Sequence, residues 1–276
     1  MRHHPLTAAI VALAAAGFMA CGKSETSPTA PTATAATTTA PATTTPTATT
    51  PAPTTPAPTT PTTPATSSST QAMFSKFSGN GVSVSFDGTT AIVQTSDTPD
   101  HKSPYWGIGS ANYEAPHSGM QVNPHSIAAQ NLTFHISTSP AVATATSDTP
   151  LGPIGISVNG VVFYNQYAAM RQPLTSEIVS FDRYNGHPNP NNQYHYHFEP
   201  LAITSSGRSR LIGVLLDGFP VYGPVDSDGS TPSNLDACNG HTTATADFPS
   251  GIYHYHTTTA VPYISGCFKG AAGTVR

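Results

Sequence analysis

The chain has 276 residues, of which 9% are charged, and its formal net charge at pH 7 is −4. Binding to the phosphates of nucleic acid requires clustered lysines and arginines, and the ten basic residues of this chain form no such cluster. We therefore expect no nucleic acid partner.

The first twenty residues have the features of an export signal. Arg2 supplies a positive charge, and residues 6–18 form an apolar run that is too short to span a bilayer. The small residue Ala20 follows this run and precedes Cys21. We expect a lipoprotein-type signal peptide over residues 1–20 and an extracytoplasmic location, at the cell surface or in the periplasm.

Residues 18–21, with the sequence Phe-Met-Ala-Cys, resemble the lipobox of bacterial lipoproteins. In such proteins the cysteine is diacylated and becomes the N-terminus of the mature chain. Leucine is usual in the lipobox where Phe18 stands, so ordinary signal cleavage near the same place is the alternative. We expect lipidation of Cys21, which makes a membrane a partner of the protein.

From residue 22 to about residue 70 the chain consists almost wholly of threonine, proline, alanine and serine. Such a segment has no large apolar side chains to bury and cannot offset the entropy of ordering its backbone. We therefore expect a disordered linker over residues 21–72. One folded domain should follow over residues 73–276, which is long enough for a substantial core.

Beyond residue 72 the apolar residues occur in short or alternating runs that glycine, proline and asparagine separate. Examples are residues 82–86, 131–136 and 211–216. No long stretch has a helical period, and runs of this length are typical of strands. The sequence predicts a mainly β domain with few short helices.

Three blocks occur twice in the same order, which indicates that one unit of about 45 residues has been used twice. The first block of each copy contains Asn-Gly or Asp-Gly, a strong signal for a hairpin turn. We expect two similar internal β units packed about a pseudo-twofold axis, which would bring their histidine strands near each other. The matched blocks are residues 155–165 with 213–223, the D-x-x-N-G-H segments 182–187 with 236–241, and the Y-H-Y-H segments 194–197 with 253–256.

The histidines of the repeated blocks form the candidate metal site. Side chains alternate along a strand, so the two histidines of each Y-H-Y-H segment share one face and can converge on one ion. The N-G turn would aim a third imidazole at this pair. Such ligands suit zinc and copper, and the six could build one shared site or two equivalent sites. The candidate ligands are His187, His195, His197, His241, His254 and His256.

Aspartates and tyrosines at matched positions are expected to support these ligands. Asp182 and Asp236 could accept a hydrogen bond from the second ring nitrogen of a ligand. The same two residues are the candidate general bases if the domain is an enzyme. The other residues that we expect to support the ligands are Asp217, Tyr194, Tyr196, Tyr253 and Tyr255.

Two cysteines remain in the chain if Cys21 is acylated. Cys238 and Cys267 then form an even pair in an oxidising compartment. We expect a disulfide bond between them, which would hold the second histidine motif in place.

A run of carboxylates that includes Asp226 and Asp228 has calcium-loop spacing. Ala237 stands where an EF-hand loop has its bidentate glutamate. An ordinary turn is therefore the alternative to a calcium site.

The chain resembles the YHYH family, which is named after its Tyr-His-Tyr-His motif. The resemblance covers most of the sequence after about residue 90, and the family name implies no particular activity. Tyr184 stands where members often have a cysteine, so an additional disulfide in the first unit is not expected. Besides the Y-H-Y-H segments, the resemblance rests on residues 99–101, 152–155, 217–224, 238–241 and 266–267.

One leading hypothesis and two alternatives follow from these patterns. The leading hypothesis is an extracytoplasmic domain that binds copper or zinc through the six histidines. The first alternative is a metal-dependent enzyme, a hydrolase if zinc activates water or an oxidase if copper is present. The second is a surface binding or structural module in which tyrosines and Trp106 contact a carbohydrate or another protein. His101 and His117 are further candidates to join a site, and a small-molecule or polysaccharide ligand is left open.

Overall fold

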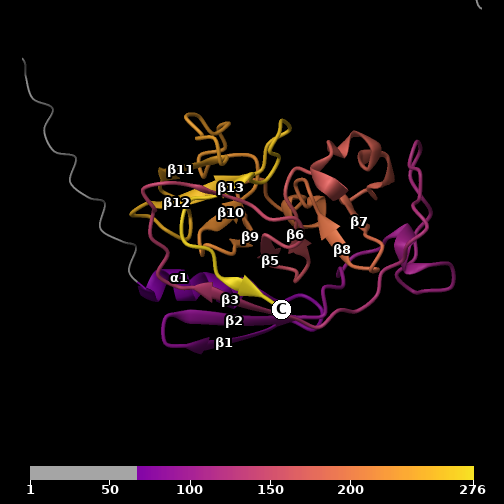
Figure 1. Cartoon of the computed structure of the whole chain (residues 1–276), viewed down its shortest axis with the longest axis horizontal. Coiled ribbons are helices and arrows are strands. Elements are labelled where there is room, and N and C mark those ends of the chain that lie inside the picture. The colour runs from indigo at the N-terminus through magenta and orange to yellow at the C-terminus, as the bar shows by residue number, and fades with distance from the viewer. Residues whose placement is uncertain (1–66) are drawn as a thin grey trace, which may run out of the picture. The chain divides into compact units, whose positions relative to one another are not determined.

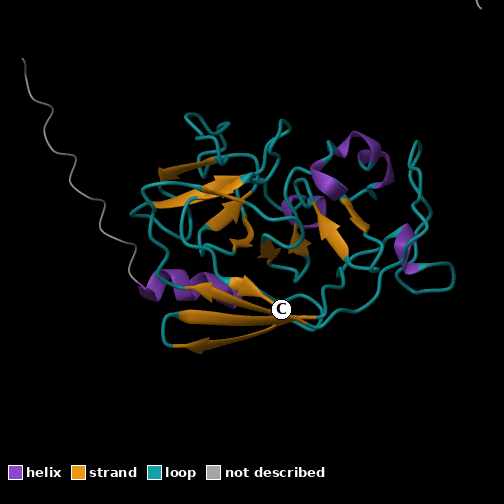
Figure 2. Ribbon diagram, viewed as in Figure 1, coloured by secondary structure: helices purple, strands orange, loops and turns teal. Residues whose placement is uncertain are grey.

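The computed structural model describes residues 67–276, which Figure 1 draws in colour. The predicted signal peptide, Cys21 and most of the predicted linker lie outside these residues. The described part consists mainly of short strands and loops with a few short helices, as Figure 2 shows. This confirms the mainly β fold class.

The folded part begins before residue 73, because helix α1 (Ser67–Met73) starts within the segment that we expected to be linker. The helix is held by Met73 at its end and by the following Phe74, both of which are buried in the core. No helix in residues 67–276 has the length and apolar character needed to cross a membrane. The other helices are η1 (Phe74–Lys76), η2 (Pro104–Trp106), η3 (Ala169–Arg171), η4 (Leu174–Ser176), η5 (Ile178–Ser180) and α2 (Leu201–Thr204).

Two of the sheets join segments that lie far apart in the sequence. Their strands are β1 (Ser83–Asp87), β2 (Thr90–Thr95), β3 (Leu132–Ser137), β4 (Ser147–Asp148), β13 (Cys267–Phe268) and β14 (Thr274–Val275). The antiparallel four-stranded sheet has the order β1-β2-β3-β14, so the C-terminal strand pairs with β3. In the smaller sheet β13 pairs with β4.

The eight-stranded sheet contains the strands that carry the repeated blocks. They are β5 (Gly155–Ser157), β6 (Val162–Phe163), β7 (Gly186–Pro188), β8 (Tyr194–Tyr196), β9 (Leu211–Leu215), β10 (Pro220–Tyr222), β11 (Gly240–Thr243) and β12 (Ile252–His256). Their order is β11-β12-β10-β9-β5-β6-β8-β7. The first copy thus supplies four successive strands on one side of the sheet, and the second copy supplies the other four.

The two copies meet through their first strands, β5 and β9. These strands are antiparallel, and Ile156 lies opposite Val214, its matched residue in the other copy. Such an order agrees with two units about a twofold axis, although the axis itself stays a prediction. The expectation that the histidine strands lie near each other is wrong, because β7 and β8 form one edge of the sheet and β11 and β12 form the other (Figure 1). The two copies pair through β5 and β9, so the strands that carry the histidines lie at the outer edges of the sheet.

The four-stranded and eight-stranded sheets share one apolar core. Val93 and Phe134 from the first, and Ile156 and Phe163 from the second, are fully buried in it. Burying one such side chain contributes about 1.5–3 kcal/mol to stability. The core therefore fixes the eight-stranded sheet and, with it, the strands that carry the histidines.

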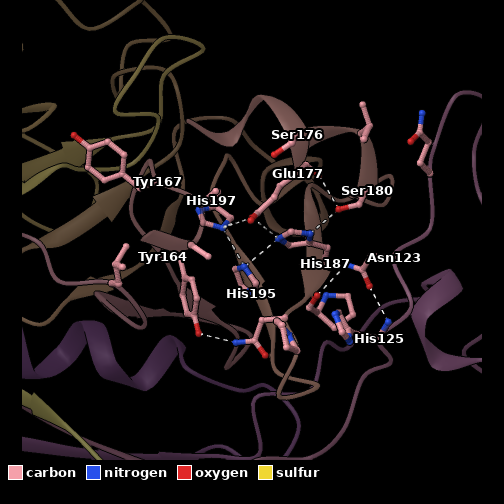
Figure 3. A pocket seen from close by; sticks show the side chains of 18 of the residues that line it. Asn123, His125, Tyr164, Tyr167, Ser176, Glu177, Ser180, His187, His195 and His197 are labelled. Atoms are coloured by element: carbon pink, nitrogen blue, oxygen red, sulfur yellow. Dashed lines mark hydrogen bonds and ion pairs between the residues drawn. The ribbon is translucent and has the colours of Figure 1, made fainter. Parts of the chain in front are cut away.

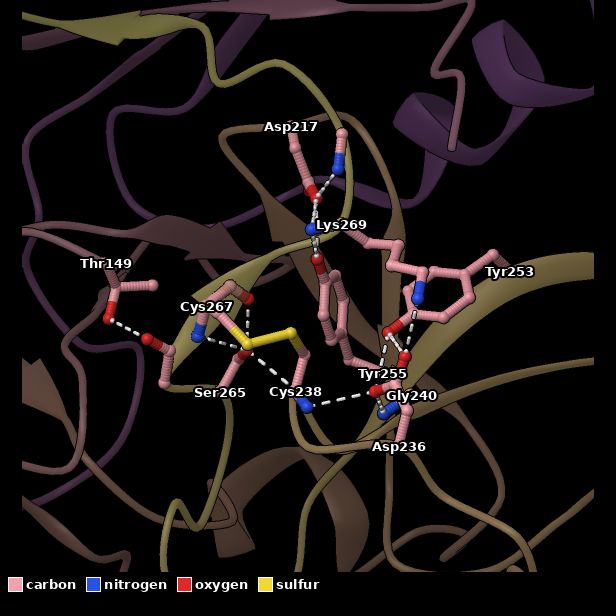
Figure 4. The surroundings of a disulfide bond; sticks show 12 residues. Thr149, Asp217, Asp236, Cys238, Gly240, Tyr253, Tyr255, Ser265, Cys267 and Lys269 are labelled. Atoms are coloured by element: carbon pink, nitrogen blue, oxygen red, sulfur yellow. Dashed lines mark hydrogen bonds and ion pairs between the residues drawn. A yellow bond between two sulfur atoms is a disulfide. The ribbon is translucent and has the colours of Figure 1, made fainter. Parts of the chain in front are cut away.

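The predicted disulfide is confirmed. Cys238, in the turn before β11, is bonded to Cys267 in β13, with a Cα–Cα distance of 5.1 Å (Figure 4). The hydroxyl of Ser265 donates to the carbonyl oxygens of both cysteines. The bond thus ties the segment that leads into the second histidine motif to the C-terminal part of the chain.

Candidate metal centres

The D-x-x-N-G-H segment of the first copy folds into a tight turn that leads into β7. The side chain of Asp182 accepts hydrogen bonds from the backbone N–H groups of Tyr184 at 2.9 Å and Gly186 at 3.3 Å. Asn185 has a φ of 67°, a left-handed conformation that asparagine tolerates well. An added Cβ at Gly186 would lie 2.3 Å from the ring of Tyr194, so only glycine fits.

The same turn recurs in the second copy. Asp236 accepts from the backbone N–H groups of Cys238 at 2.9 Å and Gly240 at 3.2 Å, and Asn239 has a φ of 64°. An added Cβ at Gly240 would lie 2.0 Å from the hydroxyl of Tyr253. The aspartate, asparagine and glycine of the motif therefore build the turn that positions the histidine after them.

The first tyrosine of each Y-H-Y-H segment donates its hydroxyl hydrogen to the turn aspartate. Tyr194 donates to Asp182 at 2.7 Å, and Tyr253 donates to Asp236 at 3.1 Å. We expected both aspartates to accept from a ring nitrogen of a ligand. The structure gives them other partners, because the turn amides and the tyrosines occupy their oxygen atoms.

The second tyrosine of each segment contacts the hairpin turn of its own copy. Asn159 donates to the hydroxyl of Tyr196 at 3.2 Å, and Tyr255 donates to Asp217 at 2.5 Å. Asn159 and Asp217 occupy matched positions in the first repeated block. All four tyrosines of the two segments are buried, so they brace the strands and form no exposed contact face.

Three imidazoles converge at one edge of the eight-stranded sheet, in the first cluster, which is His187, His195 and His197 (Figure 3). The Nε2 atom of His195 lies 3.1 Å from that of His187 and 3.0 Å from that of His197. All three side chains are buried. The structure therefore brings together the three histidines that we predicted for the first copy.

Hydrogen bonds at the other ring nitrogen fix the tautomer of two of these imidazoles. Nδ1 of His195 lies 3.1 Å from the carbonyl oxygen of Gln193, and Nδ1 of His197 lies 2.5 Å from that of Asn165. A carbonyl oxygen only accepts, so both Nδ1 atoms carry the hydrogen. Both Nε2 atoms therefore keep a free lone pair.

His187 has the same tautomer for a different reason. Its Nδ1 lies 2.7 Å from Oγ of Ser180, and this hydroxyl donates its own hydrogen to the carbonyl oxygen of Glu177. The hydroxyl must then accept from Nδ1 of His187. Three Nε2 lone pairs consequently face one another with no hydrogen between them.

Glu177 is a carboxylate of this site that the sequence did not reveal. Its Oε2 lies 3.7 Å from Nε2 of His187 and 4.0 Å from Nε2 of His197, and Figure 3 shows it pointing toward both rings. Burial raises the pKa of its carboxyl group. The residue lies between η4 and η5, outside the matched blocks, so no spacing linked it to the histidines.

The second cluster, at the opposite edge of the sheet, is His241, His254 and His256. Nε2 of His241 lies 3.2 Å from Nε2 of each of the other two, which are 3.0 Å apart. Every Nδ1 faces a backbone carbonyl oxygen, so the hydrogen is again on Nδ1 and each Nε2 carries a lone pair. These carbonyls belong to Ser233 at 3.2 Å, Ile252 at 2.9 Å and Gly223 at 2.7 Å, respectively. Oγ1 of Thr243 also lies 3.3 Å from Nε2 of His241 and can donate to it.

Asp226 belongs to the second cluster. Its Oδ1 lies 3.2 Å from Nε2 of His241 and 3.3 Å from Nε2 of His256. We expected Asp226 and Asp228 to be calcium candidates, but three imidazoles do not suit that oxygen-seeking ion. Asp228 accepts instead from the backbone N–H of Ser230 at 2.9 Å, as in an ordinary turn.

Burial favours the neutral form of the imidazoles of His187, His195, His197, His254 and His256. It lowers the pKa of His187 to about 3, that of His197 to about 4 and that of His254 to about 3. The pKa values of His195 and His256 are lowered mainly by the same cause. At neutral pH these rings are therefore in the form that binds a metal ion.

The spacing of the Nε2 atoms fits one ion in each cluster. In a tetrahedral site with metal–nitrogen distances of about 2.0–2.1 Å, the nitrogen atoms lie about 3.3–3.4 Å apart. The separations of His195 from His187 and from His197, and all three in the second cluster, are 3.0–3.2 Å, close to that value. All the ligand atoms of a cluster lie within 4.8 Å of one another. The alternative of one ion shared by the six histidines does not fit, because five inter-strand spacings, roughly 24 Å in all, separate β8 from β12.

Each cluster adjoins a pocket. The first cluster, together with Glu177 and His125, lines a pocket of about 550 Å³. His241 and Asp226 of the second cluster line a pocket of about 460 Å³. His125 is a further residue that the sequence did not reveal.

The other two candidate histidines lie outside both clusters. Nε2 of His101 lies 2.9 Å from the hydroxyl of Tyr196, and its backbone carbonyl accepts from the indole N–H of Trp106 at 3.0 Å. Nε2 of His117 lies 3.0 Å from the carbonyl oxygen of Phe181. These contacts are structural.

Fold and site together define a mainly β protein with two three-histidine clusters, one buried and one partly buried, at opposite edges of one sheet. The sequence model of the YHYH protein family matches residues 133–233 and 226–270, and the chain belongs to that family. This confirms the resemblance found from the motifs. No curated protein and no solved structure gives a significant match to the chain.

Proposed function

We propose that the domain binds two divalent transition-metal ions, one at each histidine cluster. The arrangement of ring nitrogens supports this most strongly, because three Nε2 atoms face one another in each cluster while each Nδ1 donates elsewhere. Converging lone pairs repel one another unless a cation lies among them. Coordination would also offset the cost of burying the polar imidazoles.

Zinc fits the donor sets best, and copper(II) is the alternative. With Asp226, the second cluster offers three nitrogen ligands and one oxygen ligand, a set that zinc takes in tetrahedral geometry. Cys238 and Cys267 are bonded to each other, so neither supplies a thiolate for copper(I).

The test is the metal content of protein produced without a His-tag. We expect two equivalents of zinc or copper in the unaltered protein, and one in His195→Ala and in His254→Ala, since each change removes a ligand from one cluster. His117→Ala, outside both clusters, is the matched control and should retain two equivalents. Metal content that neither cluster variant alters would exclude the proposal.

A metal-dependent hydrolase is the second candidate, which the position of Glu177 favours. Its carboxylate lies beside the first cluster, lines the same pocket and has a raised pKa, as a general base requires. Glu177 thus replaces Asp182 and Asp236 as the candidate base. Glu177→Gln should lower the rate of ester hydrolysis by about 100-fold or more at unchanged metal content. An unchanged rate would exclude this role.

We also propose that a lipid on Cys21 holds the domain at a membrane outside the cytoplasm. The signal-like N-terminus and the lipobox support this placement. The disulfide supports it as well, since such bonds persist in oxidising compartments.

A further inference from the structure

The two clusters differ in the group that lies where a fourth metal ligand would bind, beside the three Nε2 atoms. In the second cluster, Oδ1 of Asp226 lies within 3.3 Å of two Nε2 atoms, near enough to complete a tetrahedron with them. In the first cluster, Oε2 of Glu177 is 3.7 Å and 4.0 Å from its nearest Nε2 atoms. Glu177 is therefore placed beyond direct coordination, at hydrogen-bonding reach of a further ligand.

The pockets differ in the same sense. Among the residues that line the first pocket, Val122, Leu151 and Val179 are large apolar side chains with exposed fractions of 47%, 47% and 41%, and none is lysine or arginine. The second pocket has one such side chain, Val142, and is lined also by Lys269. Exposed apolar side chains gathered at one pocket mark a ligand site.

Rings inside the first pocket add a flat apolar wall beside the cluster. The ring of Tyr164 stacks on that of His195 at a centroid distance of 4.0 Å, and both line the pocket. The hydroxyl of Tyr164 is engaged with Gln193 at 2.6 Å, so the ring is held in place. The pocket therefore offers a rigid apolar surface next to the converging Nε2 atoms.

We propose that the first cluster is an open centre and the second a closed one. The fourth ligand of the metal at the first cluster would be the oxygen donor of a small organic molecule with an apolar body, and Glu177 would accept a hydrogen bond from that donor group. At the second cluster Asp226 fills the fourth position. This inference rests on the proposed binding of two metal ions.

The experiment loads the protein with cobalt(II), whose visible spectrum reports the number and type of its ligands, and titrates it with benzohydroxamate. This probe combines oxygen donors with a phenyl ring. We expect a saturable spectral change in the unaltered protein and in His254→Ala, which keeps the first centre. His195→Ala, which keeps only the second, should show no change. Acetohydroxamate should bind about tenfold more weakly, because it lacks the ring.

Two further variants make the test specific. Glu177→Gln should keep its cobalt but bind benzohydroxamate several-fold more weakly. Asp226→Ala removes the fourth ligand of the second centre. The His195→Ala/Asp226→Ala protein should therefore show a spectral change with benzohydroxamate that His195→Ala lacks. If a cluster variant fails to fold, the unaltered protein still tests the inference. Its spectral change at saturation should correspond to one of the two bound cobalt ions.

Several outcomes would overturn the inference or its basis. The first centre is not selectively open if benzohydroxamate changes the spectrum of both cobalt ions in the unaltered protein. The same conclusion follows if it changes the spectrum of the second centre alone or of neither centre. Failure to take up any cobalt would instead exclude the proposed function itself. The two failures are thus distinguished by the cobalt content before the probe is added.

Discussion

Tyr194 and His195 are neighbours in the chain, but their side chains serve different purposes. The tyrosine braces the turn through Asp182, whereas the imidazole faces the other two rings of its cluster. The alternation of a strand separates the two purposes onto opposite faces. Within the motif, the aspartate, asparagine, glycine and tyrosines therefore build a frame, and the histidines are the side chains whose ring nitrogens converge.

The two turn aspartates should differ in their effect on stability. Asp182 is buried and accepts from Ser103, Tyr194 and the turn amides, whereas the side chain of Asp236 is 32% exposed. Asp182→Ala should lower the free energy of unfolding by about 3 kcal/mol or more, because several buried donors lose their acceptor. Asp236→Ala is the matched comparison and should cost less. Equal losses in urea denaturation would contradict this reading.

The stability of the metal-free protein should fall as the pH is lowered. The pKa of His197 is about 4 in the folded protein and near its ordinary value of 6.5 when unfolded, so below pH 6.5 the unfolded chain binds the extra proton. Relative to His197→Gln, the free energy of unfolding should drop by about 1 kcal/mol per pH unit between pH 6 and 4. Buried carboxyl groups such as Asp97 have a raised pKa, which increases stability as the pH falls. Both proteins contain these groups, so their contribution cancels in the comparison. A constant difference across this range would contradict the prediction.

At the level of strands and turns, the disulfide should matter more for the second cluster than for the first. Cys238 lies inside the turn that Asp236 builds before His241. Cys238→Ser/Cys267→Ser frees a loop of 29 residues and should lower the free energy of unfolding by about 3–4 kcal/mol. Zinc at the second cluster should be lost at a lower chelator concentration than zinc at the first, which can be followed in the His195→Ala and His254→Ala backgrounds. Equal loss from both would contradict the prediction.

Local patterns predicted much of this arrangement. Alternation in the Y-H-Y-H segments and the N-G turns placed three histidines together in each copy, and the number of cysteines indicated the disulfide. Sheet order could not be predicted, because pairing of β5 with β9 depends on tertiary packing. Glu177 was not predicted as a site residue, and Asp226 was predicted only as a calcium candidate and not as a neighbour of the histidines. Both come from dissimilar connections between the second and third strands of each copy.

For the molecule as a whole, lipidation at Cys21 can be tested directly. Cells that express the full chain should incorporate labelled palmitate into the protein, and the protein should sediment with membranes. Cys21→Ser should abolish both, while the disulfide and metal content of the domain stay unchanged. A Cys21→Ser protein that still sediments with membranes would show that another feature anchors it.

The most direct test of the central claim, two separate ions each held by three Nε2 atoms, is anomalous X-ray diffraction at the zinc and copper edges from crystals of tag-free protein. We expect two anomalous peaks, one among the Nε2 atoms of each cluster, roughly 24 Å apart across the sheet. A single peak, peaks away from the imidazoles, or no peak after metal soaking would contradict the claim.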